Sequence, residues 1–201
     1  MRIHTSSIEL KHLFISWITI SYAFTIADYE LRVLFTSPAH LLAPFLISLL
    51  TVGIGFLFHE LAHKITAQRY GYWAEYRMDL AMLLFAVFLA SIARVVFAAP
   101  GAVYISSYYL TKKENGKISL AGPLANLILA MFFFGIMLST KGLLKTIAAS
   151  GLIVNTWLAA FNLIPFGPLD GKKVWDWNKE IYLTVAIIAF GSMILIIANI
   201  V

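Results

Sequence analysis

The sequence predicts an all-α polytopic membrane protein with five to six transmembrane helices and one re-entrant or strand-like segment associated with the membrane. Three observations lead to this fold class. Apolar residues make up 61% of the 201 residues and charged residues only 12%, about half of the roughly 25% typical of soluble domains. The mean hydropathy is +0.85. Six apolar runs approach or exceed the ~20 residues that cross a bilayer.

The same composition excludes several classes of protein. An apolar fraction of 61% exceeds what one soluble core of this length needs. It therefore argues against a soluble enzyme, a disordered protein and a nucleic-acid-binding domain, and we expect no nucleic-acid partner. The chain contains no cysteine, which excludes disulfides, Cys-ligated zinc and thiol nucleophiles. Any metal must be held by His, Asp or Glu.

The apolar runs predict helices over residues 12–27, 39–66, 81–98, 118–139, 143–165 and 181–201. No internal repeat and no long linker separates these runs. We therefore expect one integral-membrane domain covering residues 1–201. Its core comprises 39–71 and 118–178, and its peripheral spans are 12–27 and 181–201.

The positions of the basic residues predict an orientation in the bilayer. Suppose that the N-terminus lies on the same side as the connections after the second run, before the fourth run and after the fifth run. That side then carries eleven of the fifteen Lys and Arg residues. The positive-inside rule makes it the cytoplasmic side. We expect a multi-pass protein of the cell membrane, surrounded by lipid, with a cytoplasmic N-terminus.

This orientation requires residues 72–117 to begin and end on the same side of the membrane. The run 81–98 then dips into the membrane without crossing it. Arg94 and the following Pro100-Gly101 suit such a break, because irregular backbone at depth is tolerated only against protein or water. The alternative is a sixth full span, which would remove the charge asymmetry.

The segment GFLFHELAHKITAQRYG, residues 55–71, carries the main chemical signal. On a helix, His59 and His63 are about one turn apart, so both imidazoles can reach one Zn²⁺ at ~2.0–2.1 Å. Glu60 projects beside them, where it can exchange a proton with an activated water molecule. The structural alternative is a snorkelling cluster at a helix end. However, ionisable groups inside spans cost about 2.5–3.5 kcal/mol each on insertion scales and usually mark functional sites.

A third ligand is expected in the segment FNLIPFGPLDGKK, residues 161–173. Asp170 follows the fifth apolar run, and the predicted orientation puts it on the same side as the end of the second run. It can therefore meet His59 and His63 at a similar depth. The alternative is that Asp170 caps the N-terminus of a short helix beginning at Gly171.

The fifth run is interrupted before Asp170. Pro165, Gly167 and Pro168 break the helix after Asn162, and broken backbone in a membrane protein is costly unless it lines a cavity. Water needs such a cavity to reach a metal. Asn162 can then donate to the oxyanion of a tetrahedral intermediate or hold a substrate carbonyl. An ordinary interhelical hydrogen bond is the alternative.

The HELAH segment and the later Asn…Pro…Leu-Asp-Gly segment together resemble the site-2 protease family of intramembrane zinc metalloproteases. AGPLAN, residues 121–126, is similar to the family's Ser-Gly-Pro-x-x-Asn segment. The resemblance covers roughly 50–71 and 118–173. It implies one Zn²⁺ per chain, with these residues in the site: His59, His63 and Asp170 as ligands, Glu60 as general base, Asn162 near the substrate, and Gly122, Pro123 and Asn126 as supporting residues.

The sequence departs from the family pattern at three positions. Ala62 replaces the usual Gly of the first segment, Ala121 replaces Ser, and Leu163 stands where Pro often follows the Asn. None of these changes removes a ligand or the base. The segment 72–117 is more apolar than the short sheet-forming segment usual in the family, and no PDZ-like domain fits the chain.

The resemblance implies hydrolysis of peptide bonds in or near transmembrane segments of other proteins, close to the cytosolic face, as in regulated intramembrane proteolysis. A helical substrate must unwind before its peptide groups can react. Residues 101–110, GAVYISSYYL, alternate loosely and could present a strand edge to an extended substrate. The alternative role of this segment is to pack against neighbouring spans.

Other functions use similar residues. A membrane metal-binding or metal-transport protein would hold its ion with the same His/Asp cluster but needs no Glu beside the first His. A CAAX-prenyl type protease takes its third ligand from a helical Glu. After His63 the chain has only Glu75, Glu114 and Glu180, each in a charged connection. An inactive relative kept as a scaffold would not need Glu60. The sequence predicts neither the substrate nor the oligomeric state.

Overall fold

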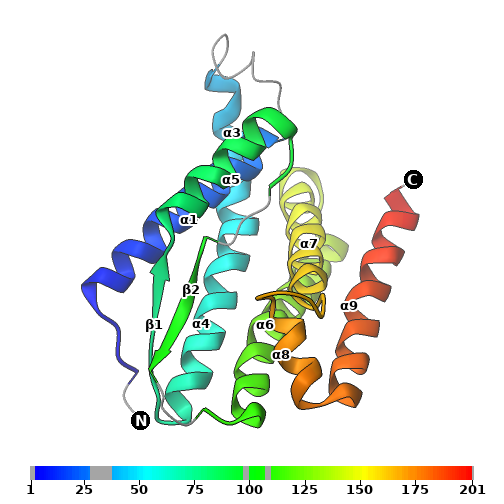
Figure 1. The fold of residues 1–201 in the computed structure, drawn as a ribbon. Helices are drawn as coiled ribbons and strands as arrows, with labels where there is room; N and C mark the ends of the chain where they lie inside the picture. Colours follow the sequence, from blue (N-terminus) through cyan, green and yellow to red (C-terminus); the bar gives the residue numbers. More distant parts are fainter. Residues whose placement is uncertain (1–2, 28–37, 97–99, 107–109, 201) are drawn as a thin grey trace.

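The computed structural model describes residues 3–27, 38–96, 100–106 and 110–200, and every structural statement here concerns those residues. Helices dominate the fold (Figure 1). In chain order the elements are α1 (Ser7–Ala27), a 3₁₀ turn (Pro38–Leu41), α3 (Leu42–Ser48), a π-helical turn (Leu49–Gly53), α4 (Ile54–Arg69), β1 (Trp73–Met78), α5 (Leu80–Ala93), β2 (Gly101–Ser106), α6 (Lys112–Ser139), α7 (Gly142–Asn162), α8 (Asp170–Trp177) and α9 (Lys179–Ile200).

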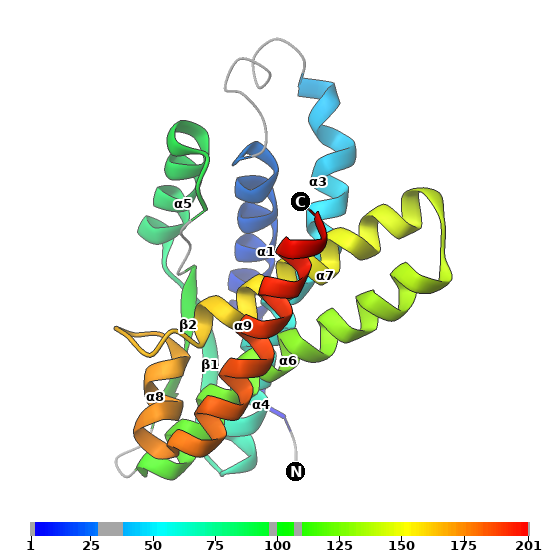
Figure 2. The ribbon, with the colours of Figure 1, turned by 90° about the vertical axis from the view of Figure 1, so that its right-hand side faces the viewer.

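Five helical segments of the described chain are long and apolar enough to cross a membrane. They are Ser7–Ala27, Ala39–Arg69, Lys112–Ser139, Gly142–Asn162 and Lys179–Ala198. The second is continuous from the 3₁₀ turn through the π-helical turn to α4. The predicted all-α polytopic fold is therefore confirmed, with five spans. Figure 2 shows α6 and α7 as an antiparallel pair that leans away from the other helices.

The segment between α4 and α6 leaves one end of the molecule and returns to it (Figure 1). β1 leads into α5, which packs along α1, and β2 runs back toward the end where α6 begins. α5 has 14 residues, about 21 Å at 1.5 Å per residue, too short to cross. It ends at Arg94, whose φ of 56° lies in the left-handed region. The structure thus agrees with a dipping segment.

β1 and β2 form a two-stranded antiparallel sheet, in which the register runs from Trp73 opposite Ser106 to Met78 opposite Gly101. The strand expected within 101–110 is thus present over its first six residues. Its continuation over 107–109 lies outside the described residues.

Helix α4 lies at the centre of the packing because glycine allows its neighbours to approach closely. A Cβ on Gly53 would lie 2.4 Å from the Trp17 ring of α1, and a Cβ on Gly55 would lie 2.5 Å from Asn155 Oδ1 of α7. Helix α6 packs along another side of α4 and also contacts α7 and α8. The histidine-bearing helix is therefore held between α1 on one side and the α6–α7 pair on the other.

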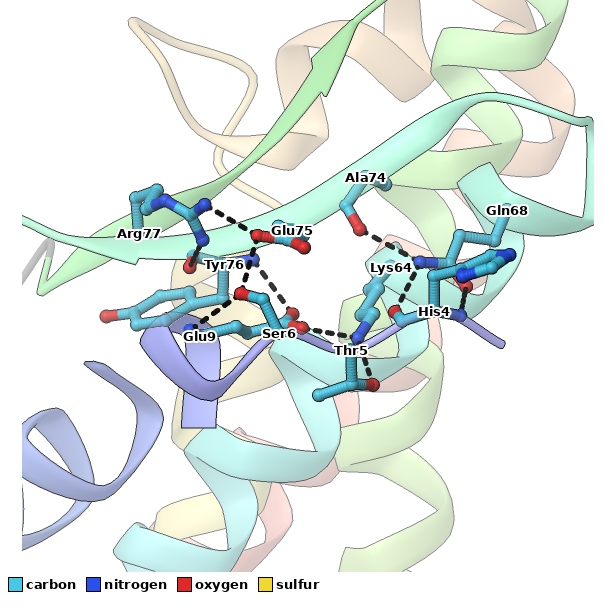
Figure 3. Close-up of polar contacts among 10 residues, drawn as sticks. All are labelled: His4, Thr5, Ser6, Glu9, Lys64, Gln68, Ala74, Glu75, Tyr76 and Arg77. Atoms are coloured by element: carbon cyan, nitrogen blue, oxygen red, sulfur yellow. Dashed lines mark hydrogen bonds and ion pairs between the residues drawn. The ribbon is translucent and has the colours of Figure 1, made fainter. Parts of the chain in front are cut away.

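A polar cluster fastens the N-terminal residues to α4 and β1 (Figure 3). Lys64 is only 1% exposed, and its Nζ contacts Glu9 Oε2 at 2.5 Å and Thr5 Oγ1 at 2.7 Å. Glu9 Oε1 accepts a hydrogen bond from the Tyr76 backbone N–H at 3.0 Å. Lys64 is thus a buried residue of α4. We call this group the N-terminal cluster; its residues are His4, Thr5, Ser6, Glu9, Lys64, Gln68, Glu75, Tyr76 and Arg77.

The outer part of this cluster is also fully paired. Glu75 Oε2 accepts from Ser6 Oγ at 3.0 Å and forms an ion pair with Arg77 at 2.6 Å. Burial raises the pKa of Glu75, but the hydrogen bonds from Arg77 and Ser6 outweigh burial and hold this pKa below its ordinary value. Gln68 Nε2 donates to the carbonyl oxygens of His4 and Ala74.

Candidate metal centre

His59 and His63 point from one face of α4 toward the start of α8. Their ring centroids are 4.6 Å apart. Asp170, the first residue of α8, meets both rings: its Oδ2 lies 3.2 Å from His59 Nε2 and 3.1 Å from His63 Nε2. All three residues are buried. Within the described residues they form a group of ligand atoms close enough to hold one metal ion.

Asp170 reaches this position because the chain turns sharply after α7. α7 ends at Asn162, and a Cβ on Gly171 would lie 2.2 Å from the Leu163 carbonyl oxygen. Glycine at 171 therefore allows α8 to start against the end of α7. Leu169, with extended backbone, occupies the cap position of α8. The alternative in which Asp170 caps this helix is therefore wrong.

The two carboxylate oxygens of Asp170 have different partners. Oδ2 faces the two imidazoles, whereas Oδ1 lies 3.8 Å from Lys173 Nζ. Burial raises the pKa of Asp170, but the neighbouring His63 and His59 outweigh burial and hold this pKa well below its ordinary value. The carboxylate is thus present as an anion beside the histidines.

Partners behind the rings determine which imidazole nitrogen faces Asp170. His63 Nδ1 lies 2.7 Å from the Ile118 carbonyl oxygen, which can only accept, so Nδ1 donates. His59 Nδ1 lies 2.6 Å from Asn126 Oδ1. The Asn126 amide nitrogen donates to the Gly55 carbonyl oxygen at 3.0 Å, so Oδ1 is the acceptor toward His59. In both neutral rings, Nε2 therefore carries the lone pair.

When both rings are neutral, three hydrogen-bond acceptors consequently face one another: two Nε2 atoms and one carboxylate oxygen. Such an arrangement is repulsive unless a proton on a ring or a metal ion lies among the three atoms. Two imidazoles and one carboxylate form the His₂-carboxylate donor set of catalytic zinc sites, which leaves a further position open. The residues present therefore fit one Zn²⁺.

Gly122 of α6 keeps the space in front of the histidines open. A Cβ at this position would lie 2.4 Å from His63 Nε2 and 2.6 Å from His59 Nε2. Pro123 follows it inside α6, where both residues are buried. Gly122 and Asn126 thus contact the histidines from the same helix.

Glu60 and Asn162 lie on the wall of a cavity of about 710 Å³ that also contains the three ligand candidates. Asn162 Nδ2 donates to the Leu158 carbonyl oxygen of its own helix at 2.9 Å. Among the described contacts, Asn162 therefore makes a hydrogen bond within its own helix, and the interhelical bond considered as an alternative is not found. Much of the rest of the wall comes from α4, from β2, from the end of α7 and from the segment before α8: Phe56, Gly101, Val103, Ile105, Phe161, Ile164, Phe166, Pro168 and Leu169.

The sequence analysis assigned no role to Asn155 of α7. This residue is completely buried, and its Oδ1 accepts a hydrogen bond from Asn126 Nδ2 at 3.1 Å. A carboxamide inside the apolar run 143–165 was a usable signal, since buried polar groups need partners. The identity of its partner depended on how α6 and α7 pack.

Comparison with known proteins gives two decisive matches. The family model described as peptidase family M50 matches residues 47–150. MJ0611 of Methanocaldococcus jannaschii, named as a zinc metalloprotease, is 44% identical over 172 residues, which cover 85% of this chain and 90% of that protein. The chain belongs to peptidase family M50, the site-2 protease family. The resemblance seen in the sequence is confirmed, and with it the assignment as a membrane-embedded metalloprotease.

Two more distant relatives are bacterial. Rip2 of Mycolicibacterium smegmatis is 28% identical over 129 residues, 56% of this chain and 49% of Rip2. YwhC of Bacillus subtilis is 29% identical over 151 residues, 66% of this chain and 68% of YwhC. Both are named as zinc metalloproteases, which agrees with the expected metal. No solved structure matched the chain.

Proposed function

We propose that this M50 peptidase hydrolyses peptide bonds in or near transmembrane segments of other membrane proteins, as in regulated intramembrane proteolysis. One Zn²⁺ is held by His59, His63 and Asp170, and Glu60 is the general base. The observation that carries the proposal is the convergence of three acceptor atoms at 3.1–3.2 Å in a cavity that Glu60 also lines.

The chemistry divides between the metal and the chain. Bound zinc supplies Lewis-acid chemistry, which polarises a carbonyl and makes water more acidic. Glu60 takes the proton from the attacking water and returns it to the leaving amine. Asn162 binds the reacting peptide: an amide nitrogen carries two hydrogens, one of which donates to Leu158, so the second can donate to the substrate carbonyl oxygen.

The sheet offers an extended substrate one edge. On the outer edge of β1, the N–H groups of Tyr76 and Met78 donate to Glu9 and His12 of α1. Because β1 and β2 are antiparallel, the residues opposite these two, Val103 and Gly101, direct their own backbone polar groups away from β1. Both line the cavity. We propose that the substrate adds to β2 as a strand.

A proline at Val103 tests this mode of binding. It removes an N–H that points away from β1, so the sheet should persist while cleavage slows. Tyr104→Ser is the matched control, because the Tyr104 side chain is 61% exposed and its loss leaves the backbone edge intact. Unchanged turnover of Val103→Pro would refute strand addition and leave the zinc chemistry untouched.

We also propose that the end of the molecule bearing Asp170 faces the cytoplasm, because the basic residues around α8 and the start of α6 lie there. The chain has no cysteine, so single cysteines at Lys113 and Lys141 can report the two sides. Labelling of Lys113→Cys only after permeabilisation of the cell supports this orientation. Labelling of that cysteine in intact cells reverses it.

The replacement Glu60→Gln tests the central chemistry. Purified full-length protein is incubated with single-span membrane proteins, and its zinc content is measured in parallel. The variant should keep stoichiometric zinc and lose about 10²–10⁴-fold in cleavage rate, the usual contribution of a general base. Glu114→Gln is the matched control, because Gln can replace Glu in the capping box of α6. Wild-type cleavage by Glu60→Gln would exclude Glu60 as the base, and zinc transport without cleavage would favour a transporter.

A further inference from the structure

His59 stands at one end of a chain of buried hydrogen bonds that passes through three helices. From His59 Nδ1 on α4 the chain continues to Asn126 Oδ1 on α6 at 2.6 Å, and from Asn126 Nδ2 to Asn155 Oδ1 on α7 at 3.1 Å. Asn155 Nδ2 in turn donates to the Gly151 carbonyl oxygen at 2.9 Å. Asn126 and Asn155 are both 0% exposed.

In each hydrogen bond of this series, the donor and the acceptor can be assigned. The carbonyl oxygen of Gly151 can only accept, so the nitrogen of the Asn155 carboxamide faces it and the oxygen faces Asn126. The Asn126 nitrogen is therefore turned toward Asn155 and toward the Gly55 carbonyl oxygen. Asn126 can then present only its oxygen to His59. With Asn155 in place, the reversed orientation of the Asn126 carboxamide would set its oxygen against Asn155 Oδ1 and the Gly55 carbonyl oxygen.

We propose that Asn155 is a positioning residue for the metal centre: together with the Gly55 carbonyl oxygen it fixes the orientation of Asn126, and so makes His59 donate through Nδ1 and direct its Nε2 lone pair at Asp170. The inference rests on the proposed metal-binding role of His59. Partners behind a ligating histidine commonly fix its tautomer and ring orientation. Here that control extends one residue further, to a side chain on a helix that carries no histidine.

Close packing supports a specific role for Asn155. A Cβ on Gly55 would lie 2.5 Å from Asn155 Oδ1, so the carboxamide fits against α4 only because residue 55 is glycine. Gly55 also supplies the carbonyl oxygen that accepts from Asn126. α4 thus contacts both asparagines within the turn that precedes His59.

The test measures the zinc affinity of full-length protein by competition with a chromophoric chelator. Asn155→Leu keeps the number and branching of the side-chain heavy atoms and removes both polar atoms. We expect zinc binding about tenfold weaker, the lower end of the 10–100-fold range for outer partners of metal ligands. Ser16→Ala is the matched control, because it also removes a buried hydrogen bond, to Tyr76 Oη at 2.9 Å, away from the site. It should leave zinc affinity unchanged.

A double-variant cycle separates positioning from general stability. If Asn155 acts through Asn126, then Asn155→Leu should weaken zinc binding little further in an Asn126→Leu background. Wild-type affinity of Asn155→Leu, or a full additional loss in the double variant, would overturn the inference. If Asn155→Leu does not fold, Gly55→Ala replaces it, since the added methyl group displaces Asn155 Oδ1, with the same two outcomes. Absence of zinc from the wild-type protein would instead refute the proposed function.

Discussion

Two polar groups of residues lie against the same helix of this apolar protein, and their chemistry differs. The N-terminal cluster is built around Lys64, and the metal centre around His63, its neighbour in the chain. In the N-terminal cluster, donors meet acceptors: the Lys64 ammonium contacts Glu9 at 2.5 Å, and the other Glu9 oxygen accepts a backbone N–H. In the metal centre, two Nε2 atoms and a carboxylate oxygen face one another.

The difference teaches how to recognise a functional site among buried polar residues. Burial and charge alone do not distinguish the two groups, since Lys64 and Glu9 are more deeply buried than His59, His63 and Asp170. The pairing of donors and acceptors does. A matched cluster such as the N-terminal one stabilises the fold by itself, whereas a group of acceptors alone requires a cation.

The largest expected effect comes from changing the acceptor group. Asp170→Asn replaces the carboxylate by an amide and should weaken zinc binding by more than about 100-fold, since loss of a ligand exceeds the loss of an outer partner. At a pH where both imidazoles are neutral, the metal-free protein should become no less stable, because one repelling charge is removed. Chelator competition and thermal unfolding in detergent measure the two effects. A marked loss of stability without zinc would show that Asp170 supports the fold in the way that Glu9 does.

The second largest effect is expected when an ion pair of the N-terminal cluster is broken. Lys64→Met leaves Glu9 buried without its cation, and we expect a loss of about 3–5 kcal/mol in the free energy of unfolding. Zinc stoichiometry should be unchanged, because the Lys64 side chain contacts Thr5 and Glu9 and none of the three candidate ligands. In the double variant Lys64→Met with Glu9→Gln, the buried charge is gone and an acceptor for Tyr76 remains, so much of the stability should return. Loss of zinc in folded Lys64→Met would couple the two clusters and weaken the comparison.

The smallest effect is expected from a change that fills space beside the histidines and alters no charge. Gly122→Ala puts a methyl group 2.4–2.6 Å from both histidine Nε2 atoms, so the rings must move and zinc should bind about tenfold more weakly, as when a ligand loses its fixed orientation. Gly135→Ala on the same helix is the control, since a Cβ there meets nothing within 4 Å. Equal zinc affinities of the two variants would show that the space in front of the histidines is not needed for the metal.

The sequence predicted those parts of the site that depend on local geometry. His59 and His63 share a helix face because of their spacing. Asp170 was predicted as the third ligand from the number of membrane crossings. That number puts the ends of the second and fifth apolar runs on the same side of the membrane. The break after Asn162 followed from three helix-breaking residues.

Other features depend on tertiary packing and could not be predicted. Glu9 and Lys64 are 55 residues apart in the chain, and each taken alone looks like a charge at a membrane surface. The pairing of Asn126 with Asn155 requires the crossing of α6 and α7. Helix α6 begins at Lys112, six residues earlier than its apolar run, because Thr111 and Glu114 form a capping box ahead of a polar first turn.

The account's central claim is that three acceptors from α4 and α8 surround one zinc ion. Zinc analysis combined with X-ray absorption spectroscopy on purified full-length protein tests this claim most directly. We predict one zinc per chain, with imidazole scattering from two nitrogen ligands at about 2.0–2.1 Å and the remaining ligands oxygen. Folded protein without zinc, or a spectrum that lacks imidazole scattering, would contradict the account.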